Sequence, residues 1–218
     1  MTRPRRLVLV AGTATDIGKT WVGGQVLSRL HAAGTTVAAR KPAQSAEADD
    51  PGPSDAAVLA AATGEPLDAV CPPHRSYTVA MAPPMAAEAL GLPVPTLAEL
   101  TAELTWPDGP ARDVGWVETV GGPRSPIGSD GDAVALAGTL DPDLVVLVAD
   151  AGLGTVNSVR LGADVFAPRP VVVFLNRYDP ADDLHRRNLD WLRTRERLEV
   201  VVDLEALSSR VAGGPATA

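Results

Sequence analysis

Residues 7–20, Leu-Val-Leu-Val-Ala-Gly-Thr-Ala-Thr-Asp-Ile-Gly-Lys-Thr, decide the fold of this chain. An apolar run of strand type leads into a glycine-bearing loop, and the residues that follow have helical spacing, with apolar side chains at Val22, Val26, Leu27 and Leu30. A strand, such a loop, Gly-Lys-Thr and a helix in this order are typical of a phosphate-binding loop. Backbone N–H groups and the helix N-terminus would face the phosphates, because the helix dipole favours negative charge there.

The spacing of this loop departs from the usual pattern, which places four residues between its first glycine and Gly-Lys. The corresponding position here is Thr13, and Gly12 lies one residue earlier. The strand before and the helix after supply the context that the motif requires, so we favour a nucleotide site over a turn with an incidental Gly-Lys-Thr. Lys19 would reach the β- and γ-phosphates, and the Thr20 hydroxyl would bind Mg²⁺. The residues expected around the nucleotide are Thr13, Ala14, Thr15, Asp16, Ile17, Gly18, Lys19 and Thr20.

Length and composition limit the kind of protein that this chain can be. Its 218 residues, 45% of them hydrophobic, suffice for one substantial core, and we expect one domain over 1–218. The net charge of −8 argues against a nucleic-acid surface, because phosphate backbones are bound by patches of Lys and Arg. Cys71 is the only cysteine, and no apolar run is long enough to span a bilayer. We therefore expect a cytoplasmic protein with no nucleic-acid or membrane partner.

Apolar runs and segments of helical spacing alternate along the chain. The expected strands are 7–11, 36–40, 114–118, 144–149, 170–175 and 198–202, and the expected helices are 20–33, 55–63, 83–90, 97–105, 132–138, 156–166, 182–196 and 203–212. Ser54 and Thr96 are expected N-caps, and Leu184, Trp191 and Leu192 are expected to face the core. Residues 65–84 and 119–131 are expected to be irregular. Residues 213–218 are expected to form a disordered tail. The alternation predicts an α/β fold, a doubly wound and mostly parallel sheet with helices on both faces, as in P-loop NTPases.

Polar residues follow several of the expected strands, at the edge where parallel sheets bind ligands. They are the phosphate loop, Lys41, Glu118, the turn at 152–157 and Asn176. Lys19 and Lys41 would place two cations near a triphosphate. Asn176 is almost equally compatible with a contact to the nucleotide base and with an ordinary turn.

A magnesium site is predicted at the same edge. Thr20, Asp55 and Glu118 would supply oxygen ligands, which suit this hard cation. Asp49 and Asp50 are alternatives to Asp55, which is also an ordinary first-turn acid of a helix. Phosphoryl transfer needs positioning and charge neutralisation, so lysines and metal ligands together predict a nucleotide-dependent enzyme.

Six short segments resemble the dethiobiotin synthetases, in the order in which that family carries them, from about residue 7 to residue 176. Gly12–Thr20 resembles their Gly-Thr-x-Thr-x-x-Gly-Lys-Thr loop, and Lys41-Pro-Ala-Gln-Ser45 resembles their Lys-Pro-x-x-[Ser/Thr] segment; these two are specific as a pair. The supporting likenesses are Ser54-Asp-Ala56 to their metal-binding aspartate region, Tyr77–Pro83 to their substrate-side loop, Glu118-Thr-Val-Gly-Gly122 to Glu-Gly-Ala-Gly-Gly, and Leu153-Gly-Thr-Val-Asn157 to Leu-Gly-x-[Ile/Leu]-Asn.

The resemblance implies an ATP- and Mg²⁺-dependent ligase of biotin biosynthesis that forms C–N bonds. Its substrates would be 7,8-diaminononanoate (7,8-diaminopelargonate), CO₂ and the nucleotide. A carbamate oxygen would attack the γ-phosphate to give a carbamic-phosphoric anhydride, and the second amine would then close the ring of dethiobiotin, leaving ADP and phosphate. The family also implies a homodimer.

The resemblance implies roles for individual residues as well. The catalytic residues would be Lys19, Lys41, Ser45 and Thr15. The substrate would contact Asp16, Lys41 and Ser45, and its carboxylate would be received across the dimer interface by Gly154, Thr155 and Asn157. Asn176 would face the base, and Thr20, Asp55 and Glu118 would serve Mg²⁺.

One departure from the family bears on activity. Thr119-Val120 replaces Gly-Ala, and a threonine would reshape the loop if the glycine supplies a positive φ or a close approach to ligand. A non-catalytic nucleotide-binding relative is therefore one alternative. A partitioning or septum-site ATPase is another, although those proteins carry an early lysine where this chain has Thr13 and Ala14. The ligase domain of a cobalamin amidating synthetase would need an added glutaminase domain. The choice between ATP, CTP and other nucleotides stays open.

Overall fold

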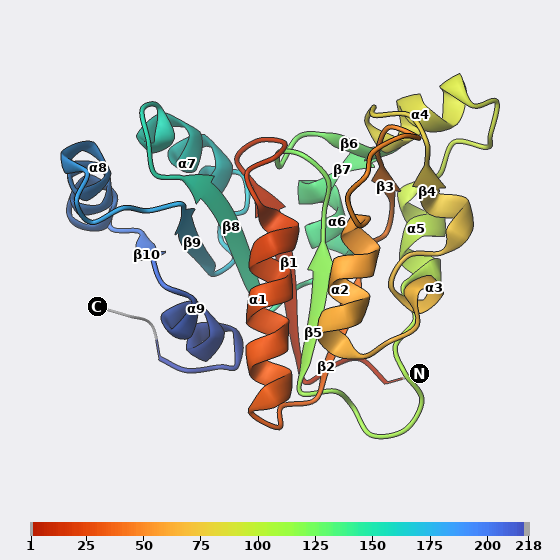
Figure 1. Ribbon diagram of the computed structural model, residues 1–218, viewed down its shortest axis with the longest axis horizontal. Helices are drawn as coiled ribbons and strands as arrows, with labels where there is room; N and C mark the ends of the chain where they lie inside the picture. Colours follow the sequence, from red (N-terminus) through yellow and green to blue (C-terminus); the bar gives the residue numbers. More distant parts are fainter. Residues whose placement is uncertain (1, 216–218) are drawn as a thin grey trace.

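The computed structural model describes residues 2–215 and contains a six-stranded sheet in the order β10-β9-β8-β1-β5-β2 (Figure 1). All neighbouring strands in this sheet are parallel. Its strands are β1 (Arg6–Gly12), β2 (Val37–Arg40), β5 (Val114–Glu118), β8 (Leu144–Asp150), β9 (Val171–Asn176) and β10 (Glu199–Val201). This arrangement confirms the predicted α/β fold with a doubly wound parallel sheet.

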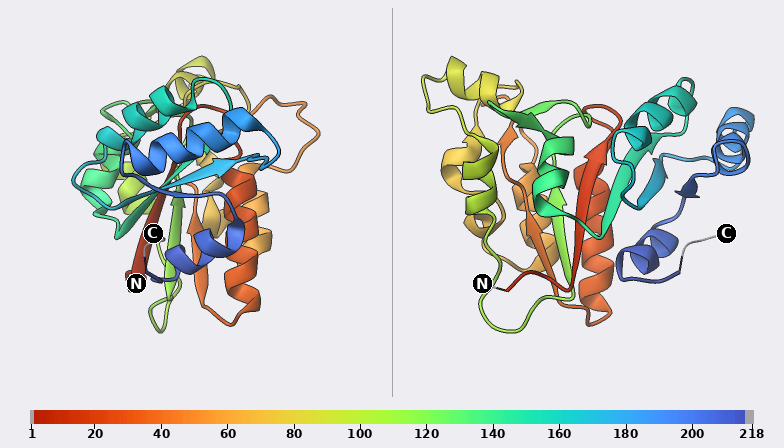
Figure 2. Two further views of the ribbon diagram at one scale, coloured as in Figure 1. Left: turned by 90° about the vertical axis from the view of Figure 1, so that its left-hand side faces the viewer. Right: turned by 180° about the vertical axis from the view of Figure 1, so that it is seen from behind.

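Helices cover both faces of the sheet, as the views from the front and from behind show (Figures 1 and 2). The core on one face includes side chains of α1 (Lys19–Ala32), α2 (Asp55–Thr63), α3 (Leu67–Val70) and α9 (Leu204–Val211). The core on the other face includes side chains of α4 (Pro83–Ala89), α5 (Leu97–Glu103), α6 (Ala133–Leu140), α7 (Thr155–Asp164) and α8 (Asp183–Thr194). Two separate cores explain why the central strands are apolar at every position.

Strand β1 illustrates the two-sided burial. Val8 and Val10 pack into one core, whereas Leu7, Leu9 and Ala11 pack into the other, because successive side chains of a strand point to opposite faces. The strand lies between β5 and β8, with Val10 in register with Glu118 on one side and Val146 on the other. The phosphate loop therefore leaves the sheet from its middle, next to the end of β5.

Side-chain caps begin several helices where the sequence predicts them. The Ser54 hydroxyl accepts a hydrogen bond from the Ala57 N–H at the start of α2. Thr96 and Glu99 form a reciprocal capping box on α5, which satisfies two backbone donors at that terminus. Both predicted N-caps are confirmed.

The prediction of irregular structure at 65–84 and 119–131 is wrong in part. The first segment contains α3, a 3-10 turn (Pro73–Arg75) and β4 (Ser76–Tyr77), which pairs in parallel with β3 (Gln44–Ser45). The second contains the antiparallel hairpin of β6 (Pro126–Gly128) and β7 (Gly131–Asp132). Strands this short have no periodicity to detect, and β3 and β4 exist because tertiary packing brings distant segments together.

The prediction that three residues of α8 face the core is wrong for two of them. Leu192 is buried, but Leu184 and Trp191 are 39% and 49% exposed. The Trp191 indole N–H donates to the Glu196 carboxylate at 2.9 Å, so this ring lies on the helix flank, and Leu189 packs inward beside Leu192. The α8 pattern predicts the helix but not its rotation about its own axis.

The tail prediction is wrong for its first residues. The N–H groups of Gly213 and Gly214 donate to the carbonyls of Arg210 and Ser209, which closes the last turn of α9. Residues 216–218 of the expected tail lie outside the described residues. Within residues 2–215, no helix has both the length and the apolar character needed to cross a membrane.

Candidate functional site

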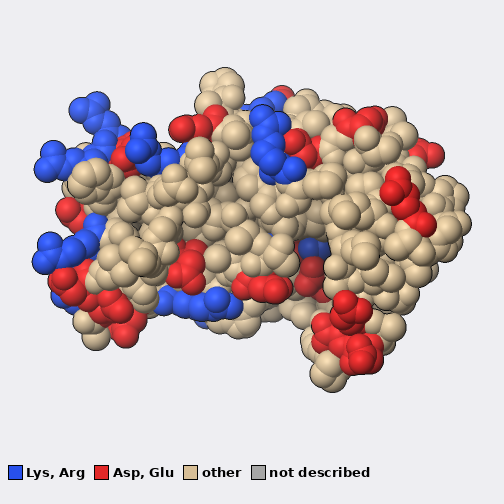
Figure 3. All heavy atoms as spheres, turned by 90° about the horizontal axis from the view of Figure 1, so that it is seen from above, with Lys and Arg blue, Asp and Glu red and all other residues tan. Residues whose placement is uncertain are grey.

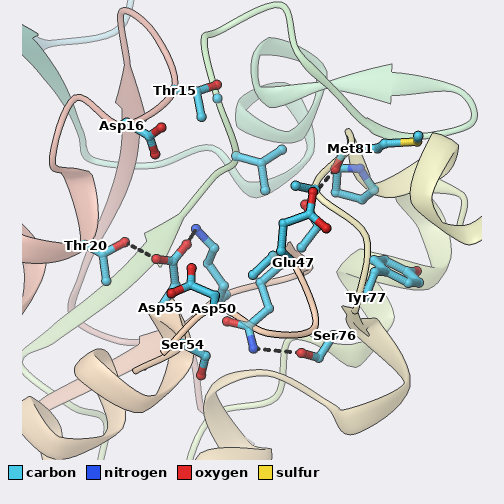
Figure 4. Close-up of a pocket in the computed structure, with 18 of the residues that line it drawn as sticks. Thr15, Asp16, Thr20, Glu47, Asp50, Ser54, Asp55, Ser76, Tyr77 and Met81 are labelled. Atoms are coloured by element: carbon cyan, nitrogen blue, oxygen red, sulfur yellow. Dashed lines mark hydrogen bonds and ion pairs between the residues drawn. The ribbon is translucent and has the colours of Figure 1, made fainter. Parts of the chain in front are cut away.

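A cavity of about 860 Å³ lies at the carboxyl edge of the sheet, between the phosphate loop, the segment after β2 and the β4–α4 connection. Viewed onto this edge, the surface is hollowed right of its centre, with basic and acidic atoms inside the hollow (Figure 3). Figure 4 shows Thr15 and Asp16 on one side and Ser76 and Tyr77 on another, with Thr20 and Asp55 turned toward each other. Eight of the sixteen predicted site residues line this cavity: Thr15, Asp16, Gly18, Lys19, Thr20, Lys41, Ser45 and Asp55.

The phosphate loop contains a left-handed backbone position, and this position is occupied by a glycine. Gly18, the N-cap of α1, has φ +93°, and a Cβ there would clash with Asn176 Nδ2. The Asn176 amide N–H donates to the Ile17 carbonyl at 2.9 Å, and Arg177 donates to the carbonyl of Asp16 at 3.2 Å. The end of β9 thus supports the loop from behind, and Asn176 is not among the residues that line the cavity. Its predicted contact with the base remains a prediction, for which its amide oxygen and its second amide N–H would be available.

Lys19 and Lys41 are the only two lysines in the sequence, and both are buried at this cavity. Burial lowers the pKa of Lys19, and the positive charge of Lys41 lowers it further. Burial would also lower the pKa of Lys41, but the charges and hydrogen bonds of Glu118 and Asp55 outweigh it and raise that pKa. Lys41 is therefore protonated at neutral pH and acts as a fixed cation.

Two carboxylates connect Lys41 with the phosphate loop. Lys41 Nζ donates to Glu118 Oε1 and pairs with Asp55 Oδ2, each at 2.7 Å. The Thr20 hydroxyl oxygen lies 2.7 Å from Asp55 Oδ1 and 2.7 Å from Glu118 Oε1, and its single proton can be donated to one of them at a time. The carboxyl of Asp55 has a lowered pKa, because the ammonium of Lys41 outweighs the effect of burial.

This oxygen cluster fits a magnesium ion. Glu118 is fully buried, and its Oε2 has no hydrogen-bond partner among the described residues, which is costly for a carboxylate unless a ligand or cation completes it. Hydroxyl and carboxylate oxygens from Thr20, Asp55 and Glu118 are the donors that Mg²⁺ prefers. Among the rival aspartates, Asp50 lines the cavity but accepts the Gly52 N–H, and Asp49 does not line it. The geometry favours Asp55.

Opposite the phosphate loop, the cavity wall is built by the β3–β4 pair. The Ser45 hydroxyl donates to the Met81 carbonyl at 2.6 Å, which ties the segment after Lys41 to the β4–α4 connection. Thr15 and Asp16 face this wall from the loop, and Asp16 has φ +57°. Thr15, Asp16 and Ser45 are thus brought together with both lysines.

The segment after β5 accommodates its threonine without strain. Thr119 is absent from the positive-φ residues, and the left-handed position of this loop is Gly121, at φ +53°. The concern that Thr119 occupies a position needing glycine is therefore not supported by the backbone. Val120 and Gly121 both line the cavity.

The predicted substrate residues Gly154, Thr155 and Asn157 lie apart from the cavity of this chain. None of the three lines it, and Leu153 beside them is 93% exposed. The Thr155 hydroxyl donates to the Asp150 carbonyl, so it holds its own loop together. Helix α7 begins at Thr155 with Gly154 as N-cap and no side-chain cap. The Thr155 N–H donates to the Gly152 carbonyl at 3.3 Å, and within residues 2–215 the N–H groups of Val156 and Asn157 are left for another partner.

Two polar residues with structural roles at the site were not predicted. Gln44 Oε1 accepts the Ala56 N–H at 2.9 Å, and its Nε2 donates to Ser76 at 3.0 Å, so it joins β3 to α2 and β4. Asn188 Nδ2 donates to the carbonyls of Ala151 and Gly152, at 2.9 Å each, and holds the turn before α7. The position of Gln44 inside the Lys41–Ser45 motif could have identified it from the sequence. Asn188 lies in a charged helix, where no sequence motif distinguishes it.

Comparison with known proteins places the chain in a family. A family described as an AAA domain matches residues 6–210. The chain is 37% identical to the ATP-dependent dethiobiotin synthetase BioD of Anaeromyxobacter dehalogenans (strain 2CP-C), over 82% of this chain and 79% of that protein. It is 34% identical to the protein of the same name from Rhodococcus jostii (strain RHA1), over 94% of this chain and 89% of that protein.

Solved structures show the same fold at low sequence identity. A plasmid partition protein from Borrelia burgdorferi matches with TM-score 0.54 and 12% identity, over 97% of each chain. The signal recognition particle receptor FtsY from Elizabethkingia anophelis matches with TM-score 0.54 and 13% identity, over 97% of this chain and 65% of that one. These structures support the P-loop fold alone, because fold does not determine function.

Proposed function

Because the chain belongs to the family of ATP-dependent dethiobiotin synthetases, a group of ligases, we propose that it closes the ureido ring of dethiobiotin in biotin biosynthesis. The substrates are 7,8-diaminononanoate, CO₂ and ATP. One amine takes up CO₂ as a carbamate, and a carbamate oxygen attacks the γ-phosphate with release of ADP. The second amine attacks the carbonyl carbon of the resulting mixed anhydride, and phosphate leaves as the ring closes.

The observation that carries this proposal is the position of Lys41. Its ammonium lies on Glu118 and Asp55, the same carboxylates that meet the Thr20 hydroxyl of the phosphate loop. A nucleotide held by this loop would therefore direct its terminal phosphate toward a second, permanently charged lysine. Charge neutralisation at that point is what a phosphoryl transfer to a carbamate oxygen requires.

The residues of one chain can be assigned as follows. Lys19 and Thr15 bind the transferring phosphate from the loop, and Lys41 and Ser45 orient the carbamate from the opposite wall. Asp16 faces the amines, whose positive charge its carboxylate would attract. When bound, Mg²⁺ would neutralise charge on the phosphates, and Thr20, Asp55 and Glu118 would hold it.

The carboxylate of the diamine needs a separate site. We infer that the N-terminus of α7, at Gly154, Thr155 and Asn157, receives it from a partner subunit, since these residues lie outside the cavity of their own chain. Uncapped N–H groups at a helix N-terminus suit a carboxylate. A homodimer would bring the two halves of the substrate site together.

The chain itself weakens the main alternatives. A partitioning-type ATPase would carry an early lysine in its loop, whereas this chain has Thr13 and Ala14 there and only two lysines in all. A non-catalytic relative was suggested by Thr119-Val120, and the backbone of Thr119, which is not at positive φ, removes one of the two reasons for it.

The test is mass spectrometry of a reaction that contains the protein, the diamine, bicarbonate, Mg²⁺ and ATP, with CTP in a parallel reaction. A dethiobiotin mass that depends on both nucleotide and diamine is expected. The control omits only the nucleotide. Absence of product with either nucleotide, while nucleotide still binds, would contradict the proposal and favour a non-catalytic relative.

A further inference from the structure

Thr119 makes two hydrogen bonds to one carbonyl group at the end of the central strand. Its backbone N–H and its hydroxyl both donate to the Val10 carbonyl, each at 2.9 Å. A carbonyl oxygen has two lone pairs, so both bonds can form together. Thr119 is fully buried, and its β-branched side chain has few rotamers. The hydroxyl therefore has few other orientations, and its bond to the Val10 carbonyl is persistent.

The same residue contacts the second lysine. The carbonyl oxygen of Thr119 accepts a hydrogen bond from Lys41 Nζ at 3.3 Å, next to the 2.7 Å bond from that ammonium to Glu118. Val10 lies two residues before Gly12, where the phosphate loop leaves β1. The hydroxyl of Thr119 therefore joins the strand that carries the phosphate loop to the strand end that holds Lys41.

We propose that Thr119 is a positioning residue, whose hydroxyl bond to Val10 fixes the end of β5 so that Lys41 stays at a set distance from the phosphate loop. The inference deepens the proposed function and rests on it for its catalytic part. A glycine at this position, as in the family pattern, would keep the backbone bond but lack the hydroxyl bond. This chain thus has a side-chain restraint on Lys41 that the family pattern does not encode.

The presence of only two lysines makes a direct test of this restraint possible. Protein labelled with ¹³C and ¹⁵N in lysine should give side-chain signals for Lys19 and Lys41 alone, and Lys41→Arg assigns them. Thr119→Val keeps the branched shape and removes the O–H, whereas Thr119→Ser keeps the O–H. We expect Thr119→Val to move the Lys41 signals while the Lys19 signals stay in place, and Thr119→Ser to restore the wild-type spectrum.

Turnover supplies the second measurement. Thr119→Val should lower kcat about fivefold, the factor that corresponds to one hydrogen bond, with the KM for ATP changed less than about twofold. Thr119→Ser should recover most of kcat. Unmoved Lys41 signals in Thr119→Val, moved signals with unchanged kcat, or equal losses in the two variants would overturn the proposal.

Failure of the two proposals can be told apart. If the wild-type protein forms no dethiobiotin, the proposed function fails, and the lysine spectra still decide whether Thr119 restrains Lys41. A drop in Tm for Thr119→Val without any change at Lys41 would identify a purely structural role and overturn the positioning role.

Discussion

Replacing Lys41 with methionine should separate its contribution to stability from its contribution to chemistry. Methionine is unbranched and flexible, so it can occupy much of the space of the lysine side chain without its charge. The Lys41 and Glu118 side chains are 1% and 0% exposed, and their ion pair measures 2.7 Å. Lys41→Met therefore leaves a buried carboxylate without its cation, while Asp55, at 43% exposure, remains hydrated in part.

The size of the effect follows from this burial. Removing one partner of a buried ion pair costs about 3–5 kcal/mol, and we take about 3 kcal/mol because the Thr20 hydroxyl still contacts Glu118. In a protein of this length, each kcal/mol lowers Tm by about 2–4 °C, so Tm should fall by about 6–12 °C. The double variant Lys41→Met/Glu118→Gln has no unpaired buried charge and should recover more than half of this loss.

Differential scanning calorimetry and the dethiobiotin assay measure the two contributions. The matched control is Arg187→Met, which removes an exposed cation from its pair with Asp183 and should leave Tm almost unchanged. Turnover should be lost in both Lys41 variants, even where the double variant regains stability. A Tm within about 2 °C of wild type for Lys41→Met, or a double variant less stable than either single variant, would refute the account of this pair.

Three further predictions concern the same site. Glu118→Gln should raise the Mg²⁺ concentration needed for nucleotide binding several-fold, and an unchanged magnesium titration would remove Glu118 from the metal ligands. Gly18→Ala should weaken nucleotide binding and destabilise the fold by more than about 1 kcal/mol, because φ is +93° and the new Cβ would meet Asn176; unchanged calorimetric and binding data would contradict this. Because the pKa of Lys41 is raised above its ordinary value of 10.5, its stabilisation is full below that pH and is lost as pH rises through the folded-state value. Wild-type stability should therefore fall at high pH more steeply than that of Lys41→Met in urea titrations, and parallel curves would argue against the raised pKa.

Local sequence was enough for the sheet, most of the helices and the identity of the phosphate loop. The apolar run at Leu144–Ala149 indicates a strand buried on both faces, and β8 packs into both cores. Ser54 and Thr96 mark helix starts because a capping bond spans only three residues. Such features depend on neighbours along the chain, and the printed sequence contains those neighbours.

Other features depend on segments that are distant in the sequence. The strands β3 and β4 are two residues long and lie some thirty residues apart, so neither has a pattern of its own (Figure 1). The inward face of α8 depends on where α7 and β10 leave space, and spacing along one helix cannot supply that information. Sequence likewise left three aspartates as candidates for the metal, and the fold places Asp55 against Thr20 and Lys41.

Sequence patterns therefore established which residues stand at the carboxyl edge of the sheet, since parallel strands bring their ends to one edge whatever their exact packing. Tertiary structure alone decided which of those residues touch: Lys41 with Glu118 and Asp55, Asn176 with the back of the phosphate loop, and Thr119 with Val10. The physical reason is the distance along the sequence over which each kind of interaction acts. Helix periodicity, strand apolarity and capping act over a few neighbouring residues, whereas a hydrogen bond between groups 77 or 159 positions apart is set by the packing of the whole sheet.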